Sequence, residues 1–405
     1  MEWKEVTLGE VSSKIGDGLH GTPQYDGDGS YYFINGNNLN CGKIIIKDDT
    51  KRVGIDEFVK NQKELNEQTL LVSINGTIGN VAKYNNEPCI LGKSACYINV
   101  IKEVDKEFIY YVLTSANFKR NITNEATGTT IKNVSLKQMR EYKFNIPCNI
   151  SDQRRIASIL SSLDRKIELN NKINADLEEM AQAIFKNWFV DFEPFKNGKF
   201  VDSELGKIPE GWKVGRLDEI ADVVGGSTPS KAKPEYYTQK GIAWLTPKDL
   251  SNHPAVYTSR GEIDITEEGY NSTSTKLMPK GTILFTSRAP IGYISIAQND
   301  ICTNQGFKSL VPKKAGTCFL YCFLKYVTPE IENKSTGSTF KEASGSLMKS
   351  LQVIMPEQKV FEDFETIVSP LFARIESLEK ESSRLSLLRD TLLPRLMSGE
   401  LEVPE

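Results

Sequence analysis

The sequence predicts an α+β protein in which two similar mixed α/β heads are joined by two long antiparallel coiled-coil helices, with a pseudo-two-fold relation between the halves. Three observations predict this fold class. The chain is written twice, each copy opens with short strand-like runs, and each copy closes with a long heptad-patterned segment. The expected parts are a first head over 1–150, a central spacer helix over 151–195, a second head over 196–355 and a C-terminal spacer helix over 356–405.

The internal repeat has an offset of 209 residues at the start and near the end of each copy. Trp3-Lys4 recurs as Trp212-Lys213, and Pro147 recurs as Pro356. Between these ends lie further matches at the same offset, namely Thr127, Gly128, Thr130, Lys132 and Met139 with Thr336, Gly337, Thr339, Lys341 and Met348. In the middle of the copies the offset becomes 213, which indicates a local insertion of four residues in the second copy.

Short strands are expected in each head. Apolar runs at 31–34, 70–74, 282–286 and 293–296 are rich in β-branched and aromatic residues, and Gly, Asn and Asp clusters separate them. These runs predict a sheet-containing head in each copy rather than a helical bundle.

The first long helix is expected to begin near Ser151-Asp152, which are good N-cap residues, and to end near Phe189. Its seam recurs every three or four residues from Ile156 to Ile184, with polar steps at Asn170 and Asn174. The second helix follows Pro356, with a seam expected at positions 360, 364, 367, 371, 378, 385, 388 and 392. Pro370 is expected to kink or split this helix.

Two helices of similar length bury their apolar seams most simply on each other, in antiparallel orientation. An ordinary structural coiled coil is one interpretation. The sharper one is a spacer that holds two similar heads at a fixed separation.

Composition excludes several classes of protein. The 405 residues suffice for two or three domains, and no apolar run reaches the length of a membrane span. Seven scattered cysteines without a CxxC pair argue against a disulfide framework or zinc ribbon and fit a reducing cytoplasm. Only two histidines exist, His20 and His253, which excludes a His-rich metal site.

Catalytic and cofactor motifs are not found in the sequence. Gly92-Lys93-Ser94 resembles the end of a P-loop, but Glu87 stands where that motif needs glycine. No Asn-Pro-Pro-aromatic motif occurs. We therefore expect no catalytic residue, no metal site and no cofactor in this chain.

Loops rich in amides and hydroxyls are the remaining candidates for function. In copy one these are Asn35, Asn37 and Asn38, and in the comparable stretch of copy two they are Thr246 and Lys248. Asn can read adenine and Lys can read guanine in a DNA major groove.

The duplicated Thr-Gly-[Thr/Ser]-Thr-x-Lys motif adds two hydroxyls and one cation in each copy, a composition suited to DNA phosphates. Its candidate residues are Thr129, Thr130 and Lys132 in copy one and Ser338, Thr339 and Lys341 in copy two. An ordinary Gly turn with solvated hydroxyls is the alternative.

A cluster of large apolar residues stands at the end of the first helix. Trp188, Phe189 and Phe192 are candidates for an interface with a partner subunit or with a face of a head.

The sequence resembles the specificity subunits of type I restriction–modification systems, and the resemblance covers the whole chain. It is carried by motifs that are specific in combination: the repeated Trp start, Ser287-Arg288-Ala289-Pro290-Ile291-Gly292, Thr303-Asn304-Gln305-Gly306-Phe307, Gln153-Arg154-Arg155-Ile156-Ala157-Ser158-Ile159-Leu160, the 184–192 segment and the 392–400 segment. Copy one departs from the second copy, with 73–79 reading Ser-Ile-Asn-Gly-Thr-Ile-Gly.

The resemblance implies two target-recognition domains that each read one half of a bipartite double-stranded DNA site, with the helices setting the gap. It adds Arg288 as a DNA-binding candidate. It also implies two modification subunits that use S-adenosylmethionine to methylate adenine, and restriction subunits that use ATP and Mg for translocation and cleavage, all in the cytoplasm and without a membrane.

Two alternatives remain open at the level of the sequence. A self-contained restriction or methylation enzyme would need a methyltransferase loop or a nuclease cluster. A coiled-coil scaffold whose two heads bind ligands other than DNA would show no preference for a DNA sequence.

Overall fold

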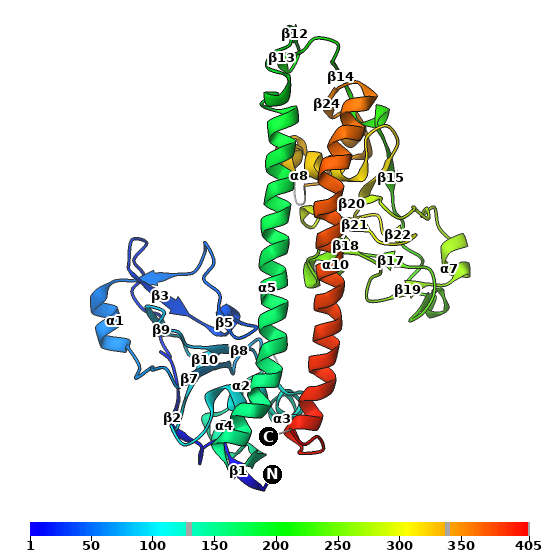
Figure 1. The fold of residues 1–405 in the computed structure, drawn as a ribbon. Coiled ribbons are helices and arrows are strands. Elements are labelled where there is room, and N and C mark those ends of the chain that lie inside the picture. The colour runs from blue at the N-terminus through cyan, green and yellow to red at the C-terminus, as the bar shows by residue number, and fades with distance from the viewer. Residues whose placement is uncertain (127–131, 337–340, 404–405) are drawn as a thin grey trace. The chain divides into compact units, whose positions relative to one another are not determined.

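The computed structural model describes residues 1–126, 132–336 and 341–403 and divides into two compact units. Unit 1 comprises residues 1–167 and 384–405, and unit 2 comprises residues 168–383. Each unit therefore contains one head and one half of each long helix, α5 (Ile150–Phe189, green in Figure 1) and α10 (Gln358–Met397, orange to red). The four-part division expected from the repeat stays a prediction.

The head of unit 1 is built on a four-stranded antiparallel sheet with the order β2-β10-β7-β8. A three-stranded sheet, β6-β3-β9, adds a parallel pair between β3 and β9. The strands are β1 (Trp3–Thr7), β2 (Ser12–Asp17), β3 (Tyr31–Ile34), β4 (Leu39–Asn40), β5 (Lys43–Ile44), β6 (Arg52–Val53), β7 (Thr69–Ser73), β8 (Val81–Lys83), β9 (Cys89–Leu91), β10 (Ala95–Val100) and β11 (Lys143–Pro147). The helices are α1 (Ile55–Asn61), α2 (Lys106–Thr114), α3 (Ala116–Glu125) and α4 (Leu136–Glu141).

The head of unit 2 repeats this plan with a five-stranded sheet in the order β15-β23-β20-β21-β18 and a parallel pair, β17 with β22. The strands are β12 (Phe200–Ser203), β13 (Gly206–Pro209), β14 (Lys213–Arg216), β15 (Ala221–Gly225), β16 (Tyr237–Thr238), β17 (Trp244–Leu245), β18 (Tyr257–Thr258), β19 (Asp264–Ile265), β20 (Ile283–Ser287), β21 (Ile291–Ala297), β22 (Cys302–Thr303), β23 (Lys308–Pro312) and β24 (Gln352–Met355). The helices are α6 (Pro247–Asn252), α7 (Glu267–Asn271), α8 (Thr317–Lys334) and α9 (Gly345–Ser350).

The structural register confirms the repeat. In unit 1, β1 pairs with β11 so that Lys4 faces Ile146, and in unit 2 β14 pairs with β24 so that Lys213 faces Met355. Both paired positions of unit 2 differ from those of unit 1 by the repeat offset of 209 residues. The predicted fold class, with two similar mixed heads and two long helices, is confirmed.

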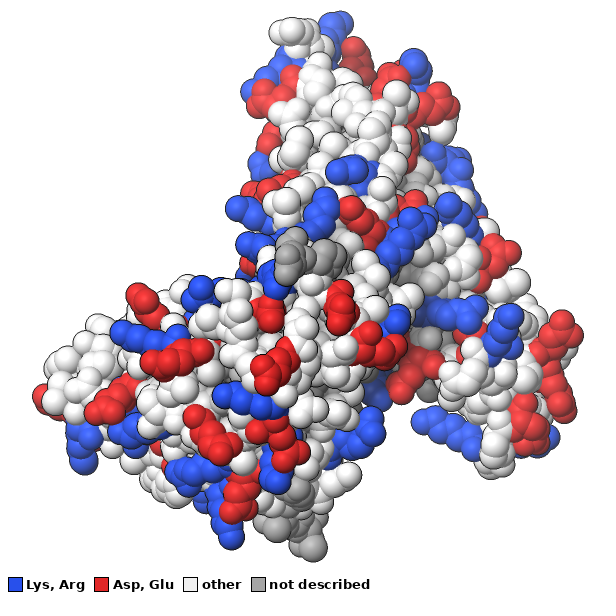
Figure 2. Space-filling model, turned by 60° about the horizontal axis from the view of Figure 1, so that its bottom comes forward, with Lys and Arg blue, Asp and Glu red and all other residues white. Residues whose placement is uncertain are grey.

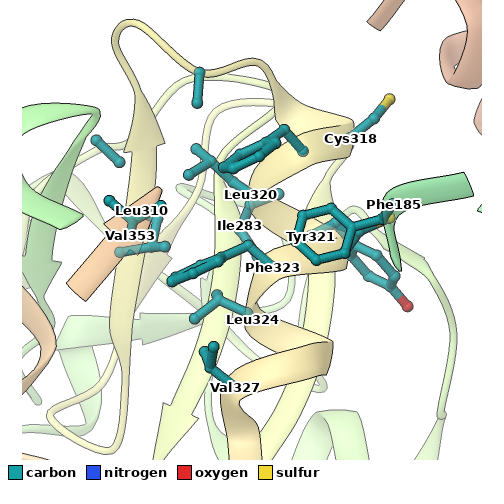
Figure 3. Packing of buried hydrophobic residues seen from close by; sticks show 14 of the residues in the cluster. Phe185, Ile283, Leu310, Cys318, Leu320, Tyr321, Phe323, Leu324, Val327 and Val353 are labelled. Atoms are coloured by element: carbon teal, nitrogen blue, oxygen red, sulfur yellow. The ribbon is translucent and has the colours of Figure 1, made fainter. Parts of the chain in front are cut away.

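The core of unit 2 forms where the apolar face of α8 covers the sheet. Figure 3 shows Leu320, Phe323 and Leu324 of α8 packed near Ile283 and Leu310 of the strands. Phe185 of α5 belongs to the same cluster of buried residues. The head and the spacer helix of this unit therefore share one core.

The seam predicted for α5 is confirmed, because each of its positions from Ile156 to Ile184 is buried or half-buried. The seam predicted for α10 is wrong at two positions, since Ile367 and Leu388 are 47% and 45% exposed. Beside the exposed Ile367, Val368 is fully buried, so the buried face runs through Val368 at this turn.

Pro370 neither splits α10 nor ends it. The helix continues without interruption from Gln358 to Met397, so the expected split is wrong, whereas the expected kink stays a prediction. The residue is exposed, in keeping with the solvent side of a helix.

The halves of α5 and α10 lie side by side and antiparallel within each unit (Figure 1). In unit 1, Arg389 Nη1 of α10 donates to Asp164 Oδ1 of α5 at 2.8 Å, and Tyr111 of α2 donates to Asp164 Oδ2 at 2.7 Å. The carboxylate of Asp164 on α5 therefore forms hydrogen bonds with both α2 of the head and the other long helix, α10.

The described part of the chain contains no helix that is both long and apolar enough to cross a membrane. All seven cysteines are free thiols.

Candidate nucleic-acid interface

A parallel strand pair ends at one edge of each head, and the candidate loops begin there. In unit 1, β3 leads into the turn at Asn35–Asn38 and β9 leads into Gly92–Ser94. The Gly92 N–H donates to the Ile34 carbonyl at 2.8 Å, and the Leu19 N–H donates to the Leu91 carbonyl at 2.7 Å. Because parallel strands end on the same side, these loops lie next to one another.

Two of the three predicted asparagines hold the turn together. The Asn38 side chain accepts from the Asn35 N–H at 3.0 Å and donates to the Ile45 carbonyl at 3.0 Å. Asn38 is only 5% exposed, so the prediction that it reads DNA is corrected to a structural role. Asn35 Oδ1 accepts from the Ser94 hydroxyl at 2.9 Å, which joins the two loops. Asn37 is exposed to solvent.

The hairpin turn between β7 and β8 brings the end of the duplicated Thr-Gly motif to the same edge. The Ile74 N–H donates to the Ser94 carbonyl at 3.0 Å, and the Val134 N–H donates to the Ile74 carbonyl at 2.9 Å. Gly76, with a φ of +74°, donates to the Lys132 carbonyl at 3.2 Å. The left-handed conformation favours glycine at this position.

We call this set of loops the loop edge. It comprises residues 35–38, 74–76, 92–94 and 132–134 in unit 1, and residues 246–249, 287–289, 304–306 and 341–343 in unit 2.

The loop edge of unit 2 is held by the same backbone hydrogen bonds. The Asn304 N–H donates to the Leu245 carbonyl at 2.9 Å, and the Ser287 N–H donates to the Gly306 carbonyl at 2.7 Å. The Ala343 N–H donates to the Ser287 carbonyl at 2.9 Å. The structure therefore brings the separate candidates of each head together twice, on one backbone plan.

The turn of unit 2 is capped as in unit 1, with different side chains. Asp249 Oδ2 accepts from the Thr246 N–H and hydroxyl, both at 2.7 Å, which commits Thr246 to the N-cap of α6. Lys248 is exposed, and its Nζ lies 3.6 Å from Glu262 Oε2, with both side chains more than 70% exposed. Such a pair is weak and leaves the lysine available to a ligand.

Basic side chains gather around the hairpin turn of unit 2. Arg288 Nη1 lies 3.5 Å from Glu342 Oε2, and Lys308 Nζ lies 3.3 Å from Glu342 Oε1. Lys341 is exposed and donates to the Glu332 carbonyl at 3.3 Å. Two cations share one carboxylate here, so the turn retains a positive balance.

A cleft of about 720 Å³ borders the loop edge of unit 2. Its lining includes Thr246, Asn304 and Gln305 together with the aromatic rings of Tyr237 and Trp244. Burial raises the pKa of Tyr237, whose hydroxyl donates to the Pro229 carbonyl at 2.6 Å. The cleft thus combines aromatic walls with amide groups, and the amides can form hydrogen bonds with the edge of a base.

Four predicted phosphate-contact residues, Thr129, Thr130, Ser338 and Thr339, lie outside the described residues. Other side chains at the loop edge were not among the predicted site residues: Asn75, Lys93, Asn304 and Gln305. The sequence repeat did not point to them, because its offset of 213 matches Lys93 with Gly306, whereas the hydrogen bonds at the strand ends match Lys93 with Gln305.

Two interfaces were predicted for the end of α5, one with a partner subunit and one with a face of a head, and the structure shows the second. Phe189 is only 4% exposed, and its ring packs on Phe319 and Phe364 with centroid distances of 4.9 and 5.1 Å. The half-buried Trp188 and Phe192 pack into the same cluster. These aromatic side chains are part of the core of unit 2, because the helix end is covered by the head and α10 of its own unit.

Comparisons with known proteins identify relatives of the chain. A family model described as type I restriction modification DNA specificity domain matches residues 1–179 and again residues 209–385. The MjaIX specificity subunit of Methanocaldococcus jannaschii is 41% identical over 190 residues, which is 46% of this chain and 44% of that protein. The HindI specificity subunit of Haemophilus influenzae is 26% identical over 359 residues, covering 73% of this chain and 77% of that protein.

A solved structure supports the same fold. The type I restriction–modification S subunit from M. genitalium superposes with a TM-score of 0.58 at 21% sequence identity, and the match covers 98% of this chain and 96% of that one.

Proposed function

The chain belongs to the type I restriction modification DNA specificity family, whose model matches both copies of its repeat, and from this premise we propose that its two heads read the two halves of a bipartite DNA site. The long helices set the gap between the half-sites. The chain itself is a non-catalytic subunit that directs partner subunits to methylate adenine or to cleave DNA.

The observation that carries the proposal is the loop edge, built twice from the same backbone contacts and bearing exposed amides and cations. Unit 1 presents Asn37, Lys93 and Lys132, and unit 2 presents Lys248, Gln305 and Lys341. Amide side chains pair with adenine, lysine pairs with guanine, and cations contact phosphates. A scaffold for an unrelated ligand would not need this chemistry in both heads.

The charge distribution supports a reader that works with partners. Figure 2 shows acidic and basic side chains interspersed over the visible face, and the net charge is −3. Binding to DNA gains most of its affinity from phosphate contacts. Two modification subunits therefore supply much of that attraction, and restriction subunits join them for cleavage.

The cofactors belong to those partners under this proposal. S-adenosylmethionine is bound by the modification subunits, and ATP and Mg are used by the restriction subunits. The complex acts in the cytoplasm, where it meets the chromosome.

The test is to co-express the chain with the modification subunits of its own system and to map methylated adenines in the host genome. We expect one motif of two short specified sequences separated by a fixed gap. Methylation without a sequence preference would overturn the proposal and favour the scaffold.

The phosphate contacts are tested with Lys132→Ala and Lys341→Ala in the same complex. Each change should weaken binding about equally for matched and mismatched duplexes and lower the salt dependence of binding. If either substitution changed the methylated motif, the result would instead show that these lysines contact bases.

A further inference from the structure

The two loop edges share one backbone, so their positions can be matched one to one. The bonds from Gly92 to Ile34 and from Asn304 to Leu245 make Gly92 and Asn304 equivalent. Lys93 and Gln305 follow directly and are therefore equivalent as well.

The capping turns give the second match. The N–H of Asn38 donates to the Asn35 carbonyl at 2.9 Å, and the N–H of Asp249 donates to the Thr246 carbonyl at 3.0 Å. Asn37 and Lys248 occupy the same place in these two turns. Both are exposed, as are Lys93 and Gln305.

An amide and a lysine occupy these two positions in each head, in exchanged order. Unit 1 has the amide on the turn (Asn37) and the lysine after the strand (Lys93), whereas unit 2 has the lysine on the turn (Lys248) and the amide after the strand (Gln305). We infer that these four side chains select the bases of the two half-sites, and that the exchange makes the half-sites differ; this inference rests on the proposed function.

The neighbouring residues form the hydrogen bonds that hold the loops together, so these four side chains remain available to contact bases. Within the described part of the chain, no hydrogen bond or ion pair engages the side chain of Asn37 or Lys93. Lys248 has only its solvent-exposed partner Glu262, and the Gln305 side-chain oxygen accepts from the Thr228 hydroxyl, which orients the amide.

Close packing between the loops fixes the spacing of each pair. A Cβ atom at Gly36 would lie 3.1 Å from the Ser94 carbonyl oxygen, and one at Gly306 would lie 2.7 Å from the Pro247 Cγ. The turn and the strand end therefore meet without room for a larger residue. This packing fixes the separation of the two backbone positions from which the side chains reach toward the bases.

Base chemistry gives the direction of the selection. An amide donates and accepts, which matches adenine N7 and N6, whereas lysine only donates, which matches guanine O6 and N7. We expect the base read by the turn and the base read by the strand end to exchange between the two half-sites.

The experiment grafts the pattern of one head onto the other. The double variant Asn37→Lys with Lys93→Gln gives unit 1 the pair of residues found in unit 2. This variant is assembled with the modification subunits, and its methylation is measured on duplexes whose first half-site is randomised. The preferred base should change by about tenfold or more at one or two positions of that half-site. The second half-site should not change. The reciprocal variant, Lys248→Asn with Gln305→Lys, should alter the second half-site only.

Lys102→Gln is the matched control. Lys93 precedes β10 and Lys102 follows it, so the control removes an exposed lysine at the opposite end of the same strand. It should leave both half-sites unchanged.

Three outcomes would overturn the inference. In the first, the double variant keeps the original half-site preference. In the second, it changes the half-site read by the other head. In the third, it assembles with an unchanged melting temperature but methylates no member of the library, a result that would make these side chains phosphate contacts. The failure of the proposed function looks different. In that case the complex with the unchanged chain would already methylate DNA without a sequence motif, before any variant is made.

Discussion

The side-chain amide of Asn170 on α5 donates to Glu381 Oε2 on α10 at 2.8 Å in unit 2, where Asn170 is fully buried. It also donates to the Ser382 hydroxyl at 3.3 Å. Its Oδ1 atom has no hydrogen-bond partner among the described residues. A polar residue of this kind in an apolar seam fixes which residues of two helices face each other, at a cost in stability.

The role of Asn170 predicts different stabilities for two substitutions. Asn170→Ala removes the hydrogen bonds and leaves a gap, so unfolding free energy should fall by about 1–2 kcal/mol. Asn170→Leu fills the seam and removes the unpaired Oδ1 atom, so it should be more stable than Asn170→Ala by a similar amount. Denaturant titration of the two variants measures the difference, and equal stabilities would show that the seam is not tightly packed at this level.

Phe189 should affect folding and not assembly. Phe189→Ala empties a buried aromatic site in unit 2 and should lower the unfolding free energy by about 3–5 kcal/mol. Met180→Ala is the control, because Met180 lies on the same helix and is 52% exposed. At a temperature where the Phe189 variant remains folded, it should co-purify with the modification subunits as the unchanged chain does. Selective loss of co-purification would restore the interface role that the sequence suggested.

The pKa of Glu379 predicts a pH dependence of stability. The carboxylate accepts from the Val256 N–H at 2.7 Å and the Tyr257 N–H at 3.0 Å, while burial, with smaller effects from Glu178 and Glu376, raises its pKa from 4.5 to about 7. A raised pKa means that the folded protein binds the proton more tightly than the unfolded chain. The stabilisation from this group is therefore complete below about pH 4.5 and is lost as the pH rises through 7.

Glu379→Gln removes this dependence because the amide stays neutral. The gain in unfolding free energy of the variant over the unchanged chain should be larger at pH 8 than at pH 5, by about 1–3 kcal/mol. Thermal or chemical unfolding at the two pH values provides the measurement. A difference that does not vary with pH would mean that Glu379 is ionised in the folded protein throughout this range.

The sequence predicted most of the fold and less of the site. The repeat and the seam of α5 could be read because identities and apolar periodicity are local properties of the chain. The seam of α10 was misplaced at Ile367 because Val368 beside it is equally apolar, and only packing shows which of the two faces the core.

The site depended on contacts between distant residues. Nothing local distinguishes the exposed Asn37 from the buried Asn38, whose role is set by its bond to Ile45. Lys93 was considered only as part of a failed P-loop, since the hydrogen bond that brings its loop to the turn joins Gly92 to Ile34 across 58 positions of the sequence.

The two long helices can be lengthened at the boundary between the units without changing a contact inside either unit. Asp164 with Arg389 lies in unit 1, and Asn170 with Glu381 lies in unit 2, so the boundaries after Ile167 and after Ser383 fall between these two contacts on both helices. Inserting seven residues at each boundary restores the same helix face and keeps every contact within the units.

The doubly extended protein should recognise the same two half-sites with a longer gap. Seven residues add roughly 10 Å at 1.5 Å per residue, which corresponds to about three base pairs at 3.4 Å each. Mapping of methylated adenines measures the gap directly. Insertion of three residues in each helix is the control, since it turns the apolar seams out of phase and should abolish recognition. If the protein with two heptads folds, assembles and still methylates only at the original gap, then the helices do not determine the spacing of the half-sites, and that distance must be set by the partner subunits.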